Sequence, residues 1–162
     1  MEGSSPKKKT LIVFADDLDK AIAAFTIATG AAAMGDDVTM FFTFWGLNIL
    51  RRQKAVPLKK GAIERMFGAL MPRGAGRLRL SKMNFFGIGA KMMNGLMKKK
   101  GVKTLPELMD LARELGVKMV ACTMSMDVMG IAKEELIDGV ELAGVASYLS
   151  EADEANVNLF IA

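Results

Sequence analysis

The chain has 162 residues, of which 51% are apolar and 25% charged, and its formal net charge is +4. These values fit one globular domain and exclude a chain that is disordered throughout. The sequence has no histidine and a single cysteine, which excludes imidazole chemistry, an intramolecular disulfide and a zinc site made of several thiolates. Because the basic excess is small, we expect no nucleic-acid partner.

The N-terminal segment is polar and contains three consecutive lysines, Lys7 to Lys9. No apolar core of a secretory signal follows it, and no uncharged apolar run in the chain reaches the roughly 18 residues that a membrane span needs. We expect residues 1–9 to be a flexible tail and residues 10–162 to form a single α/β domain. A lone thiol suits a reducing compartment, so we expect a cytoplasmic protein.

Residues 10–15 form a short apolar run that predicts a buried strand. Three aspartates follow this run, Asp16, Asp17 and Asp19. Acidic residues of this kind cap the first turn of a helix, which we expect to run to about Met34, before Gly35. Residues 37–44 are rich in Val, Thr and Phe and predict a second strand, parallel to the first because a helix connects them.

The middle of the chain is less regular. A short helix is expected from Trp45 to about Gln53. Residues 56–100 combine many Gly and several Pro residues with Met and Lys, which indicates a long insertion between core elements. Within it we expect helices around residues 63–70 and 87–97, with a loop over residues 72–79.

Regular elements return at Thr104, where Pro106 and Glu107 complete the capping-box signature of a helix start. The elements predicted from there are a helix to Leu115, a strand at 117–121, a loop and helical turn within 122–131, a small helix at 133–137, a short strand or link at 140–142, a helix at 144–154 and a strand at 157–162. Strands that alternate with helices predict an α/β fold with a mostly parallel sheet and helices on both faces, as in flavodoxin-like and Rossmann-like three-layer folds.

Three segments are predicted to lie at the carboxyl ends of strands, where open parallel sheets bind their ligands. They are Asp16-Asp17, Phe44-Trp45-Gly46 and Cys122 to Ser125. Cys122 is the strongest candidate, because the first N–H groups of a helix stabilise a thiolate, which is the nucleophilic form. The hydroxyls of Thr123 and Ser125 could donate to it, whereas a nearby Asp127 would oppose it. The alternative is a buried cysteine that acts only as a small apolar residue.

Three stretches of the sequence resemble one family. Residues 121–130 (ACTMSMDVMG) are similar to the cysteine motif of the DsrE/DsrF-like sulfurtransferase family, in its methionine-rich branch. Residues 41–47 (FFTFWGL) and 144–149 (GVASYL) are similar to further stretches of that branch. The resemblance covers nearly the whole chain after the tail.

The resemblance implies a DsrE-like fold and a cytoplasmic homo-oligomer that carries sulfane sulfur as a persulfide on Cys122. The chain would act as a sulfurtransferase without metal or cofactor, passing sulfur between protein thiols. Its partners would be other sulfur-relay proteins, either rhodanese-like or small sulfur carriers. The residues expected to line the pocket and support the thiolate are Thr123, Met124, Ser125, Asp16, Trp45 and Gly46.

The single thiol fits this role. A thiol peroxidase or a disulfide reductase usually needs a resolving cysteine. A tyrosine phosphatase would need a basic, glycine-rich loop after its cysteine, and the residues here are Thr-Met-Ser-Met. A persulfide carrier needs only one accessible thiol, because the partner supplies the second.

Two weaker patterns concern small ligands. Asp16 and Asp17 could bind a divalent cation, although we expect them to cap the helix instead. Gly87-x-Gly89 is similar to part of a dinucleotide-binding loop, but Met92 stands where the third glycine would be and no strand precedes it. We therefore expect no nucleotide cofactor.

The stretch from Met83 to Lys100 combines apolar residues with lysines. It predicts a basic amphipathic helix that could contact a membrane surface, a partner or another subunit, cover the Cys122 pocket, or pack in the core. It also supports the alternative function, a non-catalytic interaction module that docks a membrane or a redox partner while Cys122 is buried and inert. The 14 methionines suit either an irregular core or an adaptable surface.

Overall fold

A five-stranded sheet forms the centre of the protein, which is described here by a computed structural model covering residues 6–162. Its strands are β1 (Lys8–Val13), β2 (Asp37–Phe42), β3 (Lys118–Cys122), β4 (Val140–Ala143) and β5 (Val157–Ile161). The order across the sheet is β4-β3-β2-β1-β5, and every neighbouring pair is parallel. The parallel sheet predicted from the alternation of strands and helices is confirmed.

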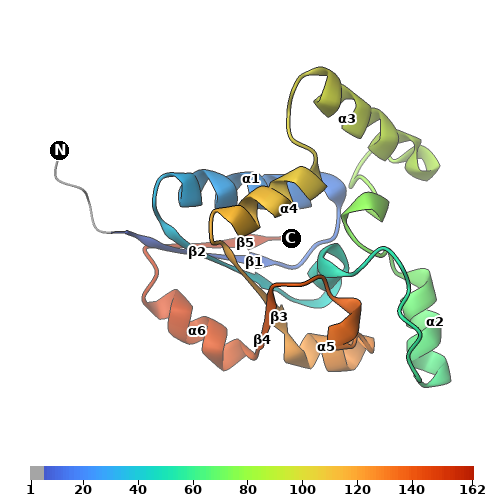
Figure 1. The fold of residues 1–162 in the computed structure, drawn as a ribbon. Coiled ribbons are helices and arrows are strands. Elements are labelled where there is room, and N and C mark those ends of the chain that lie inside the picture. The colour runs from blue at the N-terminus through green and yellow to red at the C-terminus, as the bar shows by residue number, and fades with distance from the viewer. Residues whose placement is uncertain (1–5) are drawn as a thin grey trace.

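Helices cover both faces of this sheet, as predicted (Figure 1). On one face lie α1 (Leu18–Ala33) and α4 (Leu105–Glu114), and on the other lie α5 (Thr123–Met129) and α6 (Val145–Asp153). The main core fills the space under α1 and α4, where the β-strand side chains Leu11, Val13, Met40 and Phe42 are fully or almost fully buried. The opposite face has a smaller core, because α6 buries only Tyr148.

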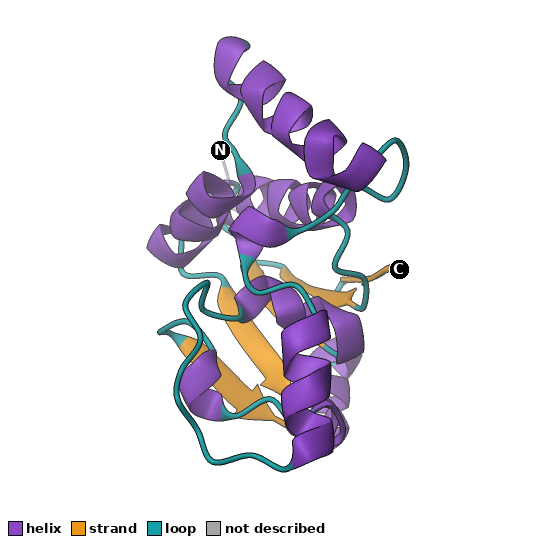
Figure 2. Ribbon diagram, turned by 90° about the vertical axis from the view of Figure 1, so that its right-hand side faces the viewer, coloured by secondary structure: helices purple, strands orange, loops and turns teal. Residues whose placement is uncertain are grey.

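The segment between β2 and α4 contains the predicted insertion. It consists of the 3-10 helix η1 (Phe44–Leu50), α2 (Ala62–Leu70), the short turns η2 (Ala75–Arg77) and η3 (Phe85–Gly87), and α3 (Ile88–Lys99). Both α2 and α3 project from one side of the molecule (Figure 1), which Figure 2 turns toward the viewer. The helix expected to reach Gln53 ends instead at Leu50, because Arg51 adopts an extended backbone.

Two predictions about helix starts have different outcomes. The capping box of α4 is confirmed, since the Glu107 carboxylate accepts hydrogen bonds from the Thr104 N–H and hydroxyl, both at 2.7 Å. The prediction that aspartates cap α1 is wrong. Asp17 is the N-cap residue but makes no capping hydrogen bond, and the N–H of Leu18 donates to the Arg79 carbonyl at 2.7 Å. A distant segment of the insertion thus satisfies the first N–H of the helix.

The first strand begins two residues earlier than predicted. Lys8 and Lys9 belong to β1, where Lys8 forms an ion pair with Glu154 and Lys9 with Asp36. The expected tail is therefore shorter at its C-terminal end, and its first five residues lie outside the described part of the chain. None of the helices in residues 6–162 combines the length and the apolar run needed to cross a bilayer.

Candidate functional site

The segments that follow β1, β2 and β3, each predicted to lie at the carboxyl end of a strand, contact one another in the structure. After β2, the N–H of Thr43 donates to the Val13 carbonyl at 3.1 Å, and the N–H of Gly46 donates to the Phe14 carbonyl at 2.8 Å. Thr43 also joins α5, because its hydroxyl lies 2.8 Å from the hydroxyl of Ser125. The first turn of η1 and the first turn of α5 are thereby held against the same edge of the sheet.

Gly46 is required by the close approach of η1 to β1. A Cβ atom at this position would lie 2.0 Å from the Val13 carbonyl oxygen. Backbone atoms on both sides of the contact cannot rotate away as a side chain could. The glycine therefore sets the path of the chain between the end of β2 and the site.

Cys122 is both the last residue of β3 and the N-cap residue of α5. Strand alternation directs its side chain to the same face as Val120, the face covered by α6. There it packs with Phe41 and Tyr148, whose ring centroids are 4.8 Å apart, and its own exposure is 0%. The thiol is thus at the predicted end of the strand but enclosed in an apolar cluster.

Tyr148 is the only buried residue of α6, and it forms the outer wall of this cluster. Its phenol oxygen lies 3.2 Å from the hydroxyl of Thr10 in β1. The Thr10 hydroxyl donates in turn to the side-chain oxygen of Asn158 in β5. A polar chain to β1 and β5 therefore fixes the tyrosine ring on the sheet face that holds Cys122.

The residues of α5 that were expected to support a thiolate differ in burial and in hydrogen bonding. Ser125 is fully buried and bonded to Thr43, Thr123 is half-buried and Met124 is exposed. Cys122 makes no side-chain capping hydrogen bond to α5. Asp127, which would have opposed a thiolate, is exposed to solvent.

Asp16 and Trp45 do not belong to the cluster around Cys122. Asp16 accepts a hydrogen bond from the Asn48 side chain at 2.9 Å. Burial raises the pKa of Asp16 above its ordinary value, although the Asn48 hydrogen bond acts in the opposite direction. Trp45 is 45% exposed at the start of η1. Within residues 6–162 there is no group of three acidic or cysteine side chains that could hold a metal ion.

A buried charge cluster that the sequence does not predict lies next to this edge of the sheet. Glu135 in the short 3-10 helix η4 (Lys133–Glu135) is buried, and so is Arg51 at the end of η1. The Glu135 carboxylate contacts Arg51 at 3.5 Å and Arg73 at 3.3 Å, and it also pairs with Lys60. The partners come from positions far apart in the sequence, so no local pattern identifies them.

This cluster connects the insertion to the element that begins at Cys122. Arg51 donates to the carbonyls of Gly68 and Pro72, each at 3.4 Å. Lys60 donates to the carbonyl of Gly130 at 2.5 Å, at the C-terminal end of α5. The C-terminal end of α5 is therefore tied to the insertion through Lys60.

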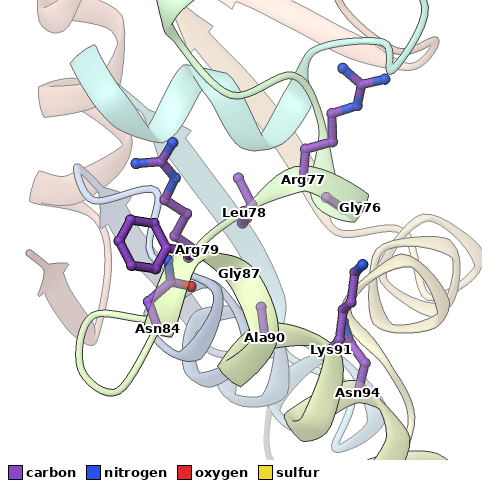
Figure 3. Close-up of a pocket in the computed structure, with 11 residues that line it drawn as sticks. Gly76, Arg77, Leu78, Arg79, Asn84, Gly87, Ala90, Lys91 and Asn94 are labelled. Carbon is purple, nitrogen blue, oxygen red and sulfur yellow. The ribbon is translucent and has the colours of Figure 1, made fainter.

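A separate hollow of about 450 Å³ lies within the insertion. Its polar lining includes Arg77, Arg79, Asn84, Lys91 and Asn94 (Figure 3). No acidic residue and no cysteine lines it. It is therefore distinct from the Cys122 cluster, and the charged side chains in its lining are all basic.

The chain is similar over almost its whole length to two curated proteins. It is 55% identical over 155 residues to the uncharacterised protein YrkE of Bacillus subtilis, covering 96% of this chain and 97% of YrkE. It is 38% identical over 162 residues to the sulfur carrier protein DsrE2 of Allochromatium vinosum, covering 96% of this chain and 98% of that protein.

Two solved structures have the same fold. The ychN protein from E. coli superposes with a TM-score of 0.54 at 12% identity, covering 95% of this chain and 98% of ychN. The protein MTH1491 of unknown function from Methanobacterium thermoautotrophicum gives a TM-score of 0.53 at 13% identity, covering 94% and 98%. The model of the DsrE/DsrF/DrsH-like family matches residues 5–160. Together with the relatives, this match shows that the chain belongs to the DsrE/DsrF/DrsH-like family, as the resemblance in its sequence motifs predicted.

Proposed function

We propose that this protein carries sulfane sulfur as a persulfide on Cys122 and passes it between the thiols of other sulfur-relay proteins. The observation that carries the proposal is the position of the chain's only cysteine, at the carboxyl end of β3 and the start of α5. Family membership and the similarity to a sulfur carrier protein support a role in sulfur relay in general. Rhodanese-like proteins and small sulfur carriers are the partners we expect.

The transfer needs no metal, cofactor or second cysteine. The Cys122 thiolate attacks the terminal sulfur of a donor persulfide, so that a new S–S bond forms on Cys122 while the donor S–S bond breaks. The donor leaves as a thiolate, and Cys122 keeps the sulfane sulfur. An acceptor thiolate then attacks that outer sulfur, and Cys122 returns to its thiolate form with no net oxidation in either step.

Burial of the thiol implies that the cluster opens before transfer. The cover over Cys122 depends on α6, which has Tyr148 as its single buried residue and leaves Val145 and Leu149 exposed. An element with so few buried contacts opens at a lower free energy than the sheet beneath it. We expect the thiol to be reached by local displacement of α6 or by contact with a partner, without unfolding of the sheet.

A homo-oligomer is part of the same proposal. The edge strand β5 leaves Phe160 exposed, and its ring stacks on that of Phe14 at a centroid distance of 6.2 Å. Together with Val145 and Leu149 of α6, these side chains give the α6 face an apolar surface that a second copy could cover. Sedimentation of the native protein measures this directly.

The test is intact mass spectrometry after incubation with polysulfide, on the native protein and on Cys122→Ser. We expect a mass gain of one or more sulfur atoms that reductant removes and that the variant lacks. Native-state alkylation of the same samples completes the experiment. If Cys122 takes up no sulfur and resists alkylation until the protein is denatured, the cysteine is structural and the proposal is wrong.

The second candidate function is the interaction module. The observation that favours it is the exposed apolar and basic surface of the insertion, which contains no cysteine. In this alternative Cys122 is inert and the surface acts alone, because none of the residues that cluster with Cys122 belongs to the insertion.

A further inference from the structure

The insertion presents two helices whose apolar stripes are left uncovered by the rest of residues 6–162. In α3 the inner face contains the buried residues Ala90 and Met97. The outer face has Ile88, Met92 and Leu96, four residues apart and 60%, 70% and 53% exposed. A stripe with this spacing normally packs against another element or lies in an interface.

The second helix repeats the pattern. Only Gly68 of α2 is buried, whereas Ile63, Met66, Phe67 and Leu70 are exposed along one side. Both helices belong to the side of the molecule that Figure 2 shows. We call this side, formed by residues 62–103, the insertion face.

The loop before α3 holds two aromatic side chains away from the protein. Phe85 and Phe86 have φ angles of 40° and 58°, and Met83 has a φ of 57°. Left-handed backbone is unfavourable for residues with a Cβ atom, and three such residues within four positions mark a constrained tip. Phe86 is fully exposed, at 107% of its reference value. The tip therefore protrudes and offers a ring with no protein partner.

The insertion face is strongly basic, and Glu64 at the start of α2 is its only acidic residue. Residues 66–106 contain nine Lys and Arg residues and no Asp or Glu. Since the whole chain has a net charge of only +4, its positive surplus resides in this segment. Within the described residues, Arg73 is the only one of the nine that forms an ion pair. The others include the cations that line the hollow of Figure 3 and the run from Lys98 to Lys100.

An apolar hollow accompanies these charges. It has a volume of about 620 Å³ and lies between residues 80–85 and α3. Its lining includes Met83, Phe85, Met92 and Leu96, and its one acidic residue, Asp19, accepts a hydrogen bond from the Ser81 hydroxyl. Flexible methionine side chains adapt to a ligand of irregular shape, and a hollow of this size can take the end of an acyl chain.

We propose that the insertion face docks peripherally on a bilayer that contains anionic phospholipid. The Phe85–Phe86 tip and the Ile88–Met92–Leu96 stripe enter the boundary between headgroups and acyl chains, and the lysines face the headgroup phosphates. A bilayer fits better than an acidic protein, because the apolar side chains protrude from two separate helices and a tip. A protein partner of ordinary size would need a matching concave surface with paired polar groups.

This inference is independent of persulfide chemistry, because no residue of the insertion face contacts Cys122. The experiment is co-sedimentation of the full chain with vesicles of phosphatidylglycerol and phosphatidylcholine in equal parts, compared with vesicles of phosphatidylcholine alone. We expect binding to the anionic vesicles only, weakened by salt. Cys122→Ser should bind like the native protein, so a failed sulfur-transfer test and a failed membrane test are distinguishable.

Two sets of variants separate the apolar and the electrostatic contributions. The pair Phe86→Ser and Ile88→Ser, and the triple change of Lys98, Lys99 and Lys100 to Gln, should each weaken binding by about tenfold or more. Val128→Ser on α5, where the side chain is 68% exposed on another element, is the matched control and should bind normally. The lysine variant retains the apolar side chains, so the test survives if the apolar pair misfolds.

Several outcomes overturn the proposal. They are absence of binding to anionic vesicles, equal binding to neutral vesicles, or unchanged binding of a folded lysine variant. Sedimentation that shows an oligomer broken by Phe86→Ser and Ile88→Ser would assign the insertion face to a second copy of the chain. Competition by a soluble acidic protein, without vesicle binding, would assign it to a protein partner.

Discussion

Replacing Glu135 by Gln should destabilise the protein by about 3 kcal/mol, the lower end of the range for breaking a buried ion pair. Glu135 is only 2% exposed, and its carboxylate contacts three cations. The carboxylate also accepts a hydrogen bond from the Ala132 N–H at 2.9 Å. Arg73 and Lys60 are partly exposed and can turn toward water. The Arg51 side chain has no exposed area and cannot turn toward water. Its charge would therefore remain in the interior without a counter-charge.

The assay is urea unfolding at pH 7, with Glu134→Gln as the matched control. Glu134 is the neighbouring residue and is exposed, so its substitution should change the free energy of unfolding by less than about 0.5 kcal/mol. A lower midpoint for Glu135→Gln at an unchanged denaturant slope would show a loss of stability without a change in the surface exposed on unfolding. Equal midpoints for the two variants would refute the role of the cluster.

The pH dependence of the free energy of unfolding tests the role of Glu135 independently. Burial alone would raise the pKa of Glu135, but the Lys60 hydrogen bond, the Ala132 N–H and the charges of Lys60 and Arg51 lower the pKa below its ordinary value. The carboxylate therefore contributes stability that is fully present above the unfolded pKa of about 4.3 and is lost as the pH falls through the folded pKa. The difference between the native protein and Glu135→Gln should shrink below about pH 4; a constant difference would contradict the assignment.

Two further predictions concern the edge of the sheet and the cover of the thiol. Gly46→Ala should destabilise the protein by about 2 kcal/mol or more, because the added Cβ would lie 2.0 Å from the Val13 carbonyl oxygen. Urea unfolding measures this loss, and Gly30→Ala is the control, since a Cβ at Gly30 meets nothing within 4 Å. Tyr148→Ala should raise the alkylation rate of Cys122 under native conditions by about tenfold or more by removing the only buried side chain of α6, and an unchanged rate would show that the thiol is reached by another route.

The parts of the fold that the sequence predicts are those that local physics determines. The apolar run of residues 10–15 and the Thr104 capping box lie in short segments whose own residues stabilise the element. The first turn of α1 differs, because the N–H of Leu18 is satisfied by Arg79, about sixty residues later in the chain. Asp16 and Asp19 accept hydrogen bonds from Asn48 and Ser81 instead, and no local property of these aspartates reveals such distant partners.

In the candidate site, too, local residues determine some features and distant residues determine others. Strand alternation and the helix start place Cys122 at the carboxyl end of β3, and that position was predictable from its neighbours. Its burial depends on Phe41 from β2 and Tyr148 from α6, which only the strand order β4-β3-β2-β1-β5 brings beside it. The burial of Arg51 was equally hidden, because a charged residue after an apolar helix usually faces water and here its partners arrive from η4 and the insertion.

The two proposed activities use different parts of the molecule, and this separation has a mechanical consequence. Cys122 lies on the face covered by α6, whereas the insertion face is formed by α2 and α3 and by the tip before α3 (Figures 1 and 2). A molecule held on a bilayer by the insertion face would keep α6 free to move and open to a soluble thiol partner. The Glu135 cluster ties the insertion to the end of α5 through Lys60 and Gly130, so docking at one side could bias the helix that begins at the cysteine. That coupling would be visible as a change in the alkylation rate of Cys122 when anionic vesicles are added to the native protein, and as its absence in Glu135→Gln.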